Sequence, residues 1–375
     1  NTSPSLIDIY HLPSVTVMQQ SLNSSNWTFH SIGSNALLNK INLHENIRTQ
    51  YGKCFYGIKT GFNMAFIISK SEKDSILMES PADEEIIKPF YEGKDLSKWY
   101  SPDIEKYLIF TKRGINIDKY PGVKNWLGKF RTSLEPKSNP EQTQGRKPGL
   151  YQWYEIQDSV DYYKLFENSK ITWPNLQNSN KFCFEDKGYY INAPSVIFPS
   201  DNIALLAILN SKLVWFYLQS VCVVRNGGYI EVKPQYFEQI PIPYISKDNQ
   251  QPFIEMADLM LSLHKELNTL KDNFLKFIIS QFDFQTTSKK LDNWNLLDPK
   301  QFITELKKNL KTEKKQDLSK SDELRWFTLF SEQKAGTDII QTQINQTDTE
   351  INKMVYELYG LSEEEIKIVE GKEPN

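Results

Sequence analysis

The sequence contains few of the residues that mark a disulfide framework or a metal site. Cysteines and histidines number only three and four: Cys54, Cys183, Cys222, His11, His30, His44 and His264. The cysteines lie far apart beside apolar or aromatic residues, which favours buried thiols in a reducing compartment over disulfides. No histidine stands at a ligand spacing from a cysteine, so we expect no metal site.

Long apolar runs and a strong net charge are also missing. No run approaches the roughly 20 residues that a membrane-spanning helix needs, and no N-terminal signal pattern is present. These absences predict a cytoplasmic protein without a membrane partner. The chain opens at Asn1 rather than methionine, and we interpret it as a piece of a longer polypeptide. Its net charge of −3 argues against binding a polyanion over the whole surface.

Two motifs resemble catalytic sites but have the wrong spacing. In a phosphate-binding P-loop, lysine directly follows the second glycine, whereas Ile58 separates Gly57 from Lys59 here. The segment Ser101–Lys106 contains the Pro-Asp and Glu-Lys pairs of metal-dependent nucleases. Those pairs fall within one turn, although such carboxylates normally come from separated strand positions. A helix N-terminus is the better interpretation, and we expect no catalytic residue in this chain.

Positive charge is concentrated between residues 112 and 147. Nine basic residues stand there against three acidic ones, which gives a local excess of about six charges. This segment is either a solvated surface or a set of phosphate contacts. The residues considered for phosphate contact are Lys112, Arg113, Lys124, Arg131, Arg146 and Lys147.

Apolar spacing and turn residues outline the elements of the first 245 residues. Helical spacing predicts helices over Ser34–Ile41, Pro121–Leu134 and Ala204–Leu218. Strand-like runs predict a strand at Ser14–Met18, a strand at Tyr107–Phe110, and β-hairpins over Cys54–Ile68 and Asp186–Asn192. Proline, glycine and polar residues predict an exposed loop over Pro136–Gly149.

Beyond Pro243 the pattern becomes that of long helices. Apolar residues recur at alternating steps of three and four from Phe253 to Phe277, and again from Ile340 to Leu358, as in a coiled coil. Gly360 follows the second run in a capping position. A capping box at Ser362 and Glu365 predicts a short last helix. We therefore expect an antiparallel helical hairpin with an elaborated polar connection.

Two glycine-bounded segments carry polar groups suited to DNA. Glycine permits tight turns and close approach of the backbone to a ligand. Arginine can donate to guanine O6 and N7, and asparagine can pair with adenine N6 and N7. The alternative for each segment is an ordinary turn or strand with solvated side chains. The candidate base contacts are Lys59, Thr60, Asn63, Arg225, Asn226, Tyr229 and Lys233.

The order of these segments resembles the TaqI-like C-terminal specificity domain of type IIG restriction-modification enzymes and adenine-N6 DNA methyltransferases. The resemblance rests on the Gly-Ile-Lys-Thr-Gly turn at Gly57–Gly61, the run Asn210–Leu218, the Gly-Gly-Tyr segment at Gly227–Tyr229, and Gln239–Pro243. The Asn-Pro-Pro-Tyr type tetrapeptide and the glycine-rich cofactor loop of adenine methyltransferases are absent from the sequence. The resemblance thus implies a specificity region separated from its catalytic domains.

The expected fold class is α+β. A mixed or antiparallel-sheet DNA target-recognition domain is expected at 51–245, after a lead-in segment and helix at 1–50 and before a helical domain with an antiparallel coiled-coil hairpin at 250–375. The resemblance implies binding to double-stranded DNA. It also implies an upstream methyltransferase domain that uses S-adenosylmethionine and, where present, a nuclease domain that uses a divalent metal such as Mg²⁺. A protein-interaction scaffold acting through the helical hairpin, or a self-sufficient enzyme, remains open.

Overall fold

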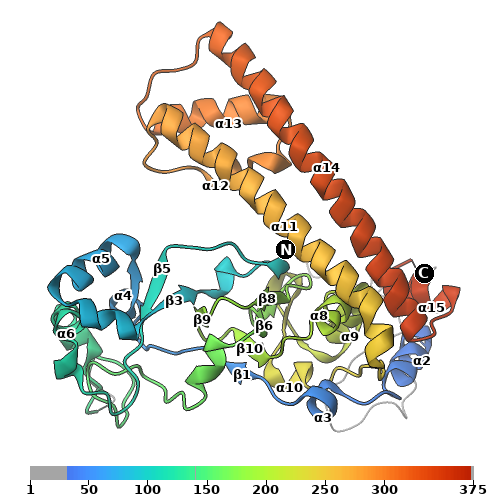
Figure 1. Cartoon of the computed structure of the whole chain (residues 1–375), viewed down its shortest axis with the longest axis horizontal. Helices are drawn as coiled ribbons and strands as arrows, with labels where there is room; N and C mark the ends of the chain where they lie inside the picture. The colour runs from blue at the N-terminus through green and yellow to red at the C-terminus, as the bar shows by residue number, and fades with distance from the viewer. Residues whose placement is uncertain (1–31, 140, 373–375) are drawn as a thin grey trace, which may run out of the picture. The chain divides into compact units, whose positions relative to one another are not determined.

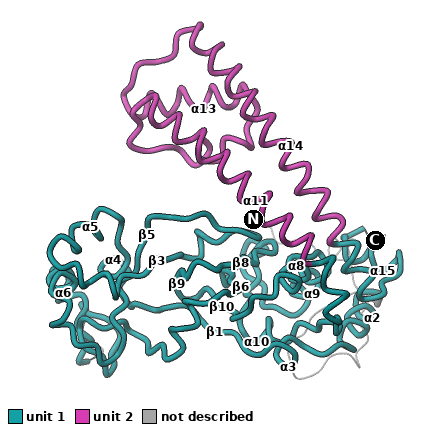
Figure 2. Tube along the Cα trace, viewed as in Figure 1, with its two compact units in different colours: residues 1–253, 352–375 teal, residues 254–351 magenta. Residues whose placement is uncertain are grey.

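The computed structural model describes residues 32–139 and 141–372 (Figure 1). It forms two compact units (Figure 2). Unit 2 is Ile254–Ile351, and unit 1 comprises the described residues before it together with those after it. The predicted helical domain at 250–375 differs from this division, because the segment from Asn352 onward groups with unit 1. The predicted strand Ser14–Met18 lies outside the described residues.

Unit 1 is an α+β structure with three sheets, which confirms the expected fold class. The five-stranded sheet has the order β1-β10-β6-β8-β4, with strands Phe55–Tyr56, Val196–Pro199, Lys170–Trp173, Cys183–Glu185 and Trp99–Tyr100. The four-stranded sheet has the order β2-β5-β3-β9, with strands Ile67–Ser69, Lys106–Ile109, Ile87–Tyr91 and Tyr190–Ile191. The three-stranded sheet has the order β11-β12-β7, with strands Val223–Arg225, Tyr229–Glu231 and Leu176–Gln177. The pairs β3–β9 and β4–β8 are parallel, and the other paired strands are antiparallel.

Short helices connect and cover these strands. The α-helices of unit 1 are α2 (Ile32–Ile41), α3 (Ile47–Tyr51), α4 (Asn63–Phe66), α5 (Lys70–Glu79), α6 (Pro121–Gly128), α7 (Arg131–Leu134), α8 (Ile203–Leu209), α9 (Lys212–Val221), α10 (Pro234–Phe237) and α15 (Glu363–Val369). The 3-10 helices of unit 1 are η2 (Pro81–Ile86), η3 (Gly93–Asp95), η4 (Ile117–Lys119), η5 (Tyr163–Glu167) and η6 (Asn226–Gly228). The capping box predicted at Ser362 and Glu365 is present at the start of α15.

The two segments predicted as β-hairpins instead connect different sheets. In Cys54–Ile68, β1 joins the five-stranded sheet and β2 joins the four-stranded sheet. The segment Asp186–Asn192 follows β8 and contains β9, and these two strands also belong to different sheets. Gly57 packs against the backbone of the second segment, where an added Cβ would lie 2.4 Å from the carbonyl carbon of Asn192. Long-range packing therefore overrides the local turn signals on which the hairpin prediction rested.

The single helix predicted over Ala204–Leu218 is two helices, α8 and α9, which meet at 63°. Asn210 interrupts them because its side chain donates to the carbonyl of Phe182 (2.9 Å) and accepts from the Phe182 amide (3.3 Å). The Ser211 side chain then caps α9. Polar side chains that bond to the backbone in this way compete with helix continuation. No single helix in residues 32–372, Pro140 aside, is long and apolar enough to span a membrane.

The helix predicted over Pro121–Leu134 begins at Pro121 as expected, but it divides into α6 and α7 at Lys129 and Phe130. Its first turn is held by the fully buried carboxylate of Asp83, which accepts from the Val123 amide at 2.5 Å. A carboxylate near a helix N-terminus also interacts favourably with the helix dipole. The basic side chains of this segment are thus presented by two short helices.

Unit 2 contains most of two long helices, α11 (Lys247–Phe282) and α14 (Lys320–Leu358), which lie side by side and run in opposite directions (Figures 1 and 2). This arrangement confirms the predicted helical hairpin. The connection forms α12 (Lys289–Asp292), η7 (Trp294–Leu296) and α13 (Pro299–Thr312).

The core of unit 2 is aromatic. The rings of Phe302 and Phe330 stack with centroids 4.3 Å apart, and Trp294 lies edge-on to Phe330 at 5.9 Å. Phe277 was predicted in the apolar seam of α11, but its side chain is 43% exposed and the neighbouring Ile278 is buried. At this end of α11, Ile278 rather than Phe277 therefore occupies the buried position of the seam.

Phe330→Ala should lower the free energy of unfolding of unit 2 by about 3 to 5 kcal/mol, because it empties a fully buried aromatic position. The matched control is Phe327→Ala on the same helix, where the side chain is 40% exposed and the loss should be about 1 kcal/mol or less. Urea denaturation followed by circular dichroism measures both. Equal losses for the two variants would contradict the assigned core.

Candidate nucleic-acid interface

The predicted base-reading segment forms an exposed two-stranded hairpin. Strands β11 and β12 pair antiparallel, with Arg225 opposite Tyr229. Gly227 and Gly228 between them adopt φ angles of 79° and 75°, which favour glycine and allow the tight reversal. Arg225, Asn226 and Tyr229 are all exposed at this tip. The turn therefore places a guanidinium, an amide and an aromatic ring together at the surface.

The base of the hairpin is anchored in the body of unit 1. Strand β12 pairs with β7, and Ile230 and Val232 are buried. The Val232 carbonyl accepts a hydrogen bond of 2.8 Å from the indole of Trp173. The ring of Trp173 stacks on Phe237 with centroids 4.2 Å apart. The exposed tip thus extends from a packed support.

Two candidate base contacts share one carboxylate. Glu231 Oε2 lies 3.0 Å from Arg225 Nη2 and 2.7 Å from Lys233 Nζ. Hydrogen bonds from Arg225 and then Lys233 hold the pKa of Glu231 below its usual range. The side chain of Glu231 is 13% exposed, whereas those of Arg225 and Lys233 are 53% and 32% exposed. The carboxylate therefore lies beneath two accessible cations.

The second predicted element, the Gly57–Gly61 turn, exposes only some of its polar groups. Lys59 and Asn63 are exposed. Thr60 was predicted to reach DNA, but it is 2% exposed and its hydroxyl donates to Asn63 Oδ1 at 2.6 Å. This prediction is wrong for Thr60, because its side chain closes the turn and its carbonyl faces the interior. Lys59 and Asn63 remain candidates for contact.

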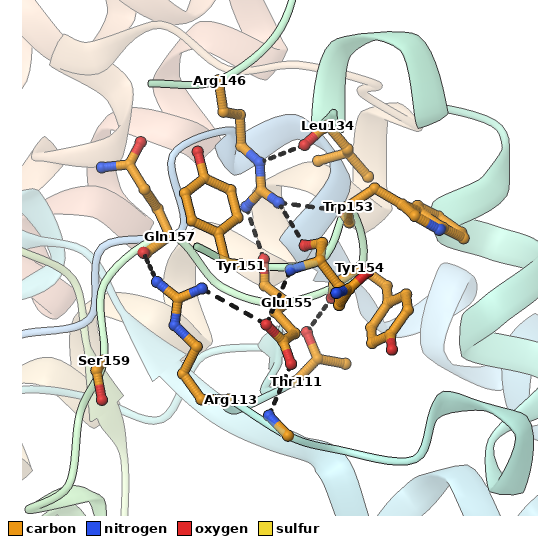
Figure 3. Close-up of polar contacts among 12 residues, drawn as sticks. Thr111, Arg113, Leu134, Arg146, Tyr151, Trp153, Tyr154, Glu155, Gln157 and Ser159 are labelled. Carbon is orange, nitrogen blue, oxygen red and sulfur yellow. Dashed lines mark hydrogen bonds and ion pairs between the residues drawn. The ribbon is translucent and has the colours of Figure 1, made fainter. Parts of the chain in front are cut away.

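Arg146 was predicted to bind phosphate, but it is 3% exposed and serves an internal role. Its guanidinium donates to five backbone carbonyls, as Figure 3 shows for most of these contacts. The acceptors are Leu134 (2.8 Å), Thr60 (2.8 Å), Glu155 (2.7 Å), Trp153 (3.0 Å) and Gln152 (3.3 Å). Burial lowers the pKa of Arg146 to about 10, which leaves the group charged at neutral pH. We call this set of contacts the Arg146 node.

Arg113 extends the node through the buried carboxylate of Glu155. Glu155 accepts from the amides of Gly114 (2.7 Å) and Gln152 (2.9 Å), and its ion pair with Arg113 spans 3.5 Å. Arg113 Nη2 also donates to the Gln157 carbonyl at 2.5 Å (Figure 3). With its side chain 30% exposed, Arg113 is mainly a structural residue rather than a free phosphate ligand.

The other basic candidates lie at the surface with different partners. Lys112 lies over the ring of Tyr163 at 4.6 Å. Lys124 pairs with Asp118 at 2.6 Å, and Arg131 pairs with Glu135 at 3.1 Å while lying over the ring of Trp153. Lys147, next to Arg146 in sequence, is exposed. Surface ion pairs of this kind contribute little stability.

The segment that carries this geometry matches a known family. Residues 88–242 match the model of the TaqI-like C-terminal specificity domain. After this match, we call residues 88–242 the specificity domain. The specificity domain contains the β11–β12 hairpin and Arg146 with four of its five carbonyl partners. The fifth partner, Thr60, belongs to the Gly57–Gly61 turn, which precedes the matched range. Residues 246–355 match a second family, described as a domain of unknown function (DUF8810).

Similar whole proteins extend well beyond this chain. The type II methyltransferase M.BstVI of Geobacillus stearothermophilus is 24% identical over 198 residues, which are 50% of this chain and 32% of that protein. The solved structure of the type IIL restriction-modification enzyme MmeI in complex with DNA is 14% identical, with a TM-score of 0.39, and the match covers 76% of this chain and 35% of that one. The chain spans about a third of the length of these two relatives.

The part of the chain that the structure describes shows no cluster of potential metal ligands. Among residues 32–139 and 141–372, no group of three or more His, Cys, Asp or Glu side chains is placed to hold a metal ion.

Sequence reasoning missed Glu231 and Glu155 as partners of the candidate arginines. Glu231 had a usable signal, because a turn at the two glycines pairs Arg225 with Tyr229 and leaves residue 231 two positions along on the same face. Glu155 had no such signal, since 42 residues separate it from Arg113. Only the folded chain of the specificity domain brings these two side chains together.

Arg146→Ala should destabilise unit 1 by about 3 kcal/mol or more, because it leaves buried carbonyls without donors. The adjacent variant Lys147→Ala removes an exposed side chain and should change stability by about 0.5 kcal/mol or less. Chemical denaturation of unit 1, followed by tryptophan fluorescence, compares the two. A mild effect of Arg146→Ala would contradict the structural role given to this residue.

Proposed function

We propose that this chain binds duplex DNA and selects a base sequence through its specificity domain. The observation that carries the proposal is the β11–β12 hairpin, which presents Arg225, Asn226 and Tyr229 at an exposed tip anchored to a packed support. A two-stranded ribbon is narrow enough to enter the major groove of DNA, which is about 12 Å wide. The family of residues 88–242 supports the same conclusion.

The chemistry of the tip suits base edges. Arg225 offers paired N–H donors for guanine O6 and N7, and the Asn226 amide offers a donor and an acceptor for adenine N6 and N7. The ring of Tyr229 is 39% exposed and supplies an apolar face for a base or a thymine methyl group. Lys233 stands beside Arg225 through their shared carboxylate. These four residues are the proposed base-contact set, with Lys59 and Asn63 as additional candidates.

The exposed cations of the basic segment are proposed to hold the DNA backbone. Lys112, Lys124, Arg131 and Lys147 are exposed, in contrast to Arg146. Contacts to phosphate orient a protein on the duplex but carry no sequence information. They should therefore contribute to affinity for every sequence.

We further propose that methyl transfer to adenine belongs to an upstream methyltransferase domain of the same polypeptide, which acts in the cytoplasm with S-adenosylmethionine. This proposal is supported by the type II methyltransferase relative, of which the chain matches 32%. A nuclease domain that uses Mg²⁺ is proposed only for a parent that also cleaves DNA. The specificity domain would then select the site at which the upstream domain flips out the target adenine.

Arg225→Ala should relax discrimination at one base position and cost about 1 to 3 kcal/mol on the preferred sequence. Lys147→Ala should weaken binding to all sequences by a similar factor, because it removes a phosphate contact. Selection from a randomised duplex library, followed by affinity measurements on enriched and scrambled duplexes, distinguishes the two variants. An equal loss on every sequence for Arg225→Ala would exclude its base-reading role.

The alternative is a protein-interaction scaffold that acts through unit 2. One observation favours it, since Leu324 and Ile339 on α14 are 68% and 63% exposed. Phosphate neutralisation predicts that DNA affinity falls by orders of magnitude between about 50 and 200 mM salt. Absence of salt-sensitive duplex binding at low ionic strength would favour the scaffold instead.

A further inference from the structure

We propose that Glu231 is a specificity-determining positioning residue: it holds Arg225 for a base edge and reduces the affinity of the hairpin for phosphate. The inference rests on the proposed function of DNA recognition. Glu231 is placed to act through its neighbours rather than to contact DNA, because its side chain is 13% exposed beneath Arg225 and Lys233.

The strand register brings the three charged side chains together. Val223 lies opposite Glu231, and Arg225 lies opposite Tyr229. In an antiparallel pair, residues two apart on one strand face the same side, so Arg225 and Glu231 are diagonal neighbours on one face. Lys233 follows Glu231 by two residues and approaches the same oxygen from beyond the end of β12, at 2.7 Å. One carboxylate thus fixes cations from both ends of the hairpin face.

The geometry leaves the guanidinium able to read a base while it is held. The hydrogen bond of 3.0 Å to Glu231 comes from Arg225 Nη2, and a guanidinium carries five N–H groups. Guanine O6 and N7 need only two of them. A side chain locked by such a supporting contact loses less conformational freedom on binding, and a misplaced base is accommodated less easily.

The charge of Glu231 acts differently on the two kinds of DNA contact. A phosphate that approaches Arg225 and Lys233 must compete with a carboxylate that already neutralises one of the two positive charges. A base edge is uncharged and does not meet that repulsion to the same extent. Glu231 should therefore disfavour sequence-independent binding more than base reading, which widens the ratio between specific and random DNA. Suppression of wrong contacts by like charge is a recognised source of specificity.

The simpler alternative is that Glu231 only forms surface ion pairs and has no role in DNA selection. Such pairs are worth between about 0 and 1 kcal/mol of folding stability and would not alter DNA selection. The two accounts therefore differ in discrimination rather than in stability. The chain provides a matched control in Glu105, whose carboxylate pairs with Lys70 at 2.8 Å and whose side chain is 68% exposed.

The test compares the full chain with its Glu231→Gln and Glu105→Gln variants. Each protein is titrated with random-sequence duplex at several salt concentrations and is used to select sequences from a randomised duplex library. For Glu231→Gln we expect tighter binding to random duplex, a log–log salt slope steeper by about one, and about ten-fold weaker enrichment of the selected sequence. Glu105→Gln should enrich the same sequence as strongly as the unchanged chain.

A double variant, Arg225→Ala with Glu231→Gln, separates positioning from general charge. If Glu231 acts through Arg225, its effect on enrichment should vanish in the Arg225→Ala background. Thermal unfolding of every variant confirms that the fold is retained.

Unchanged enrichment by folded Glu231→Gln overturns the positioning role, and unchanged or weaker affinity for random duplex overturns the effect on phosphate binding. Either result leaves the proposed function standing if the unchanged chain still selects a sequence. Failure of the unchanged chain to bind duplex in a salt-dependent way would instead reject the proposed function itself.

Discussion

Buried backbone groups must have hydrogen-bond partners, and in unit 1 side chains provide them where the sheets end. Arg146 donates to five carbonyls, Asn210 bonds to both backbone groups of Phe182, and Trp173 donates to the carbonyl of Val232. An unpaired buried carbonyl costs about 1 to 3 kcal/mol. These contacts allow irregular segments to pack without a regular ladder. They also anchor the hairpin and the Gly57–Gly61 turn, so that exposed side chains project from fixed positions.

The same requirement divides the basic residues by function. Arg146 and Arg113 bind internal carbonyls, and Arg113 also pairs with Glu155. Lys147, Lys124 and Arg131 lie at the surface instead. Fewer positive charges are therefore accessible at the surface than the local excess counted along the sequence indicates. At the hairpin, Glu231 reduces that excess further. A chain with a net charge of −3 can still present a cationic face of this limited size, because DNA affinity depends on local contacts.

Features encoded by local spacing could be predicted from the sequence. The helical hairpin of unit 2, the capping box at Ser362 and the exposed Gly-Gly turn after Arg225 all depend on neighbouring residues. Features decided by long-range packing could not be predicted. The strands around Gly57 and those around Gly188 carry hairpin-like signals, yet each pair divides between two sheets.

Arg146 and Lys147 illustrate the same limit for the candidate site. Both are basic and adjacent in a polar segment, but one is buried and the other exposed. The difference arises from carbonyls contributed by Thr60, Leu134 and the 152–155 segment, which meet only in the folded chain. The exposure of the proposed base-contact residues on the hairpin could be predicted from the sequence, because it follows from a turn within five residues.

The most direct measurement of the central claim is photo-crosslinking from the hairpin to DNA. p-Benzoylphenylalanine in place of Tyr229 is irradiated with a duplex enriched from a randomised library, and the crosslinked nucleotide is identified. The same substitution at Tyr244, which is 86% exposed in a different part of unit 1, provides the control. Our account predicts that position 229 crosslinks to a base inside the selected sequence and that position 244 does not. A duplex bound selectively without any crosslink from position 229, or with crosslinks scattered outside the selected sequence, would contradict the assignment of the hairpin as the base-reading element.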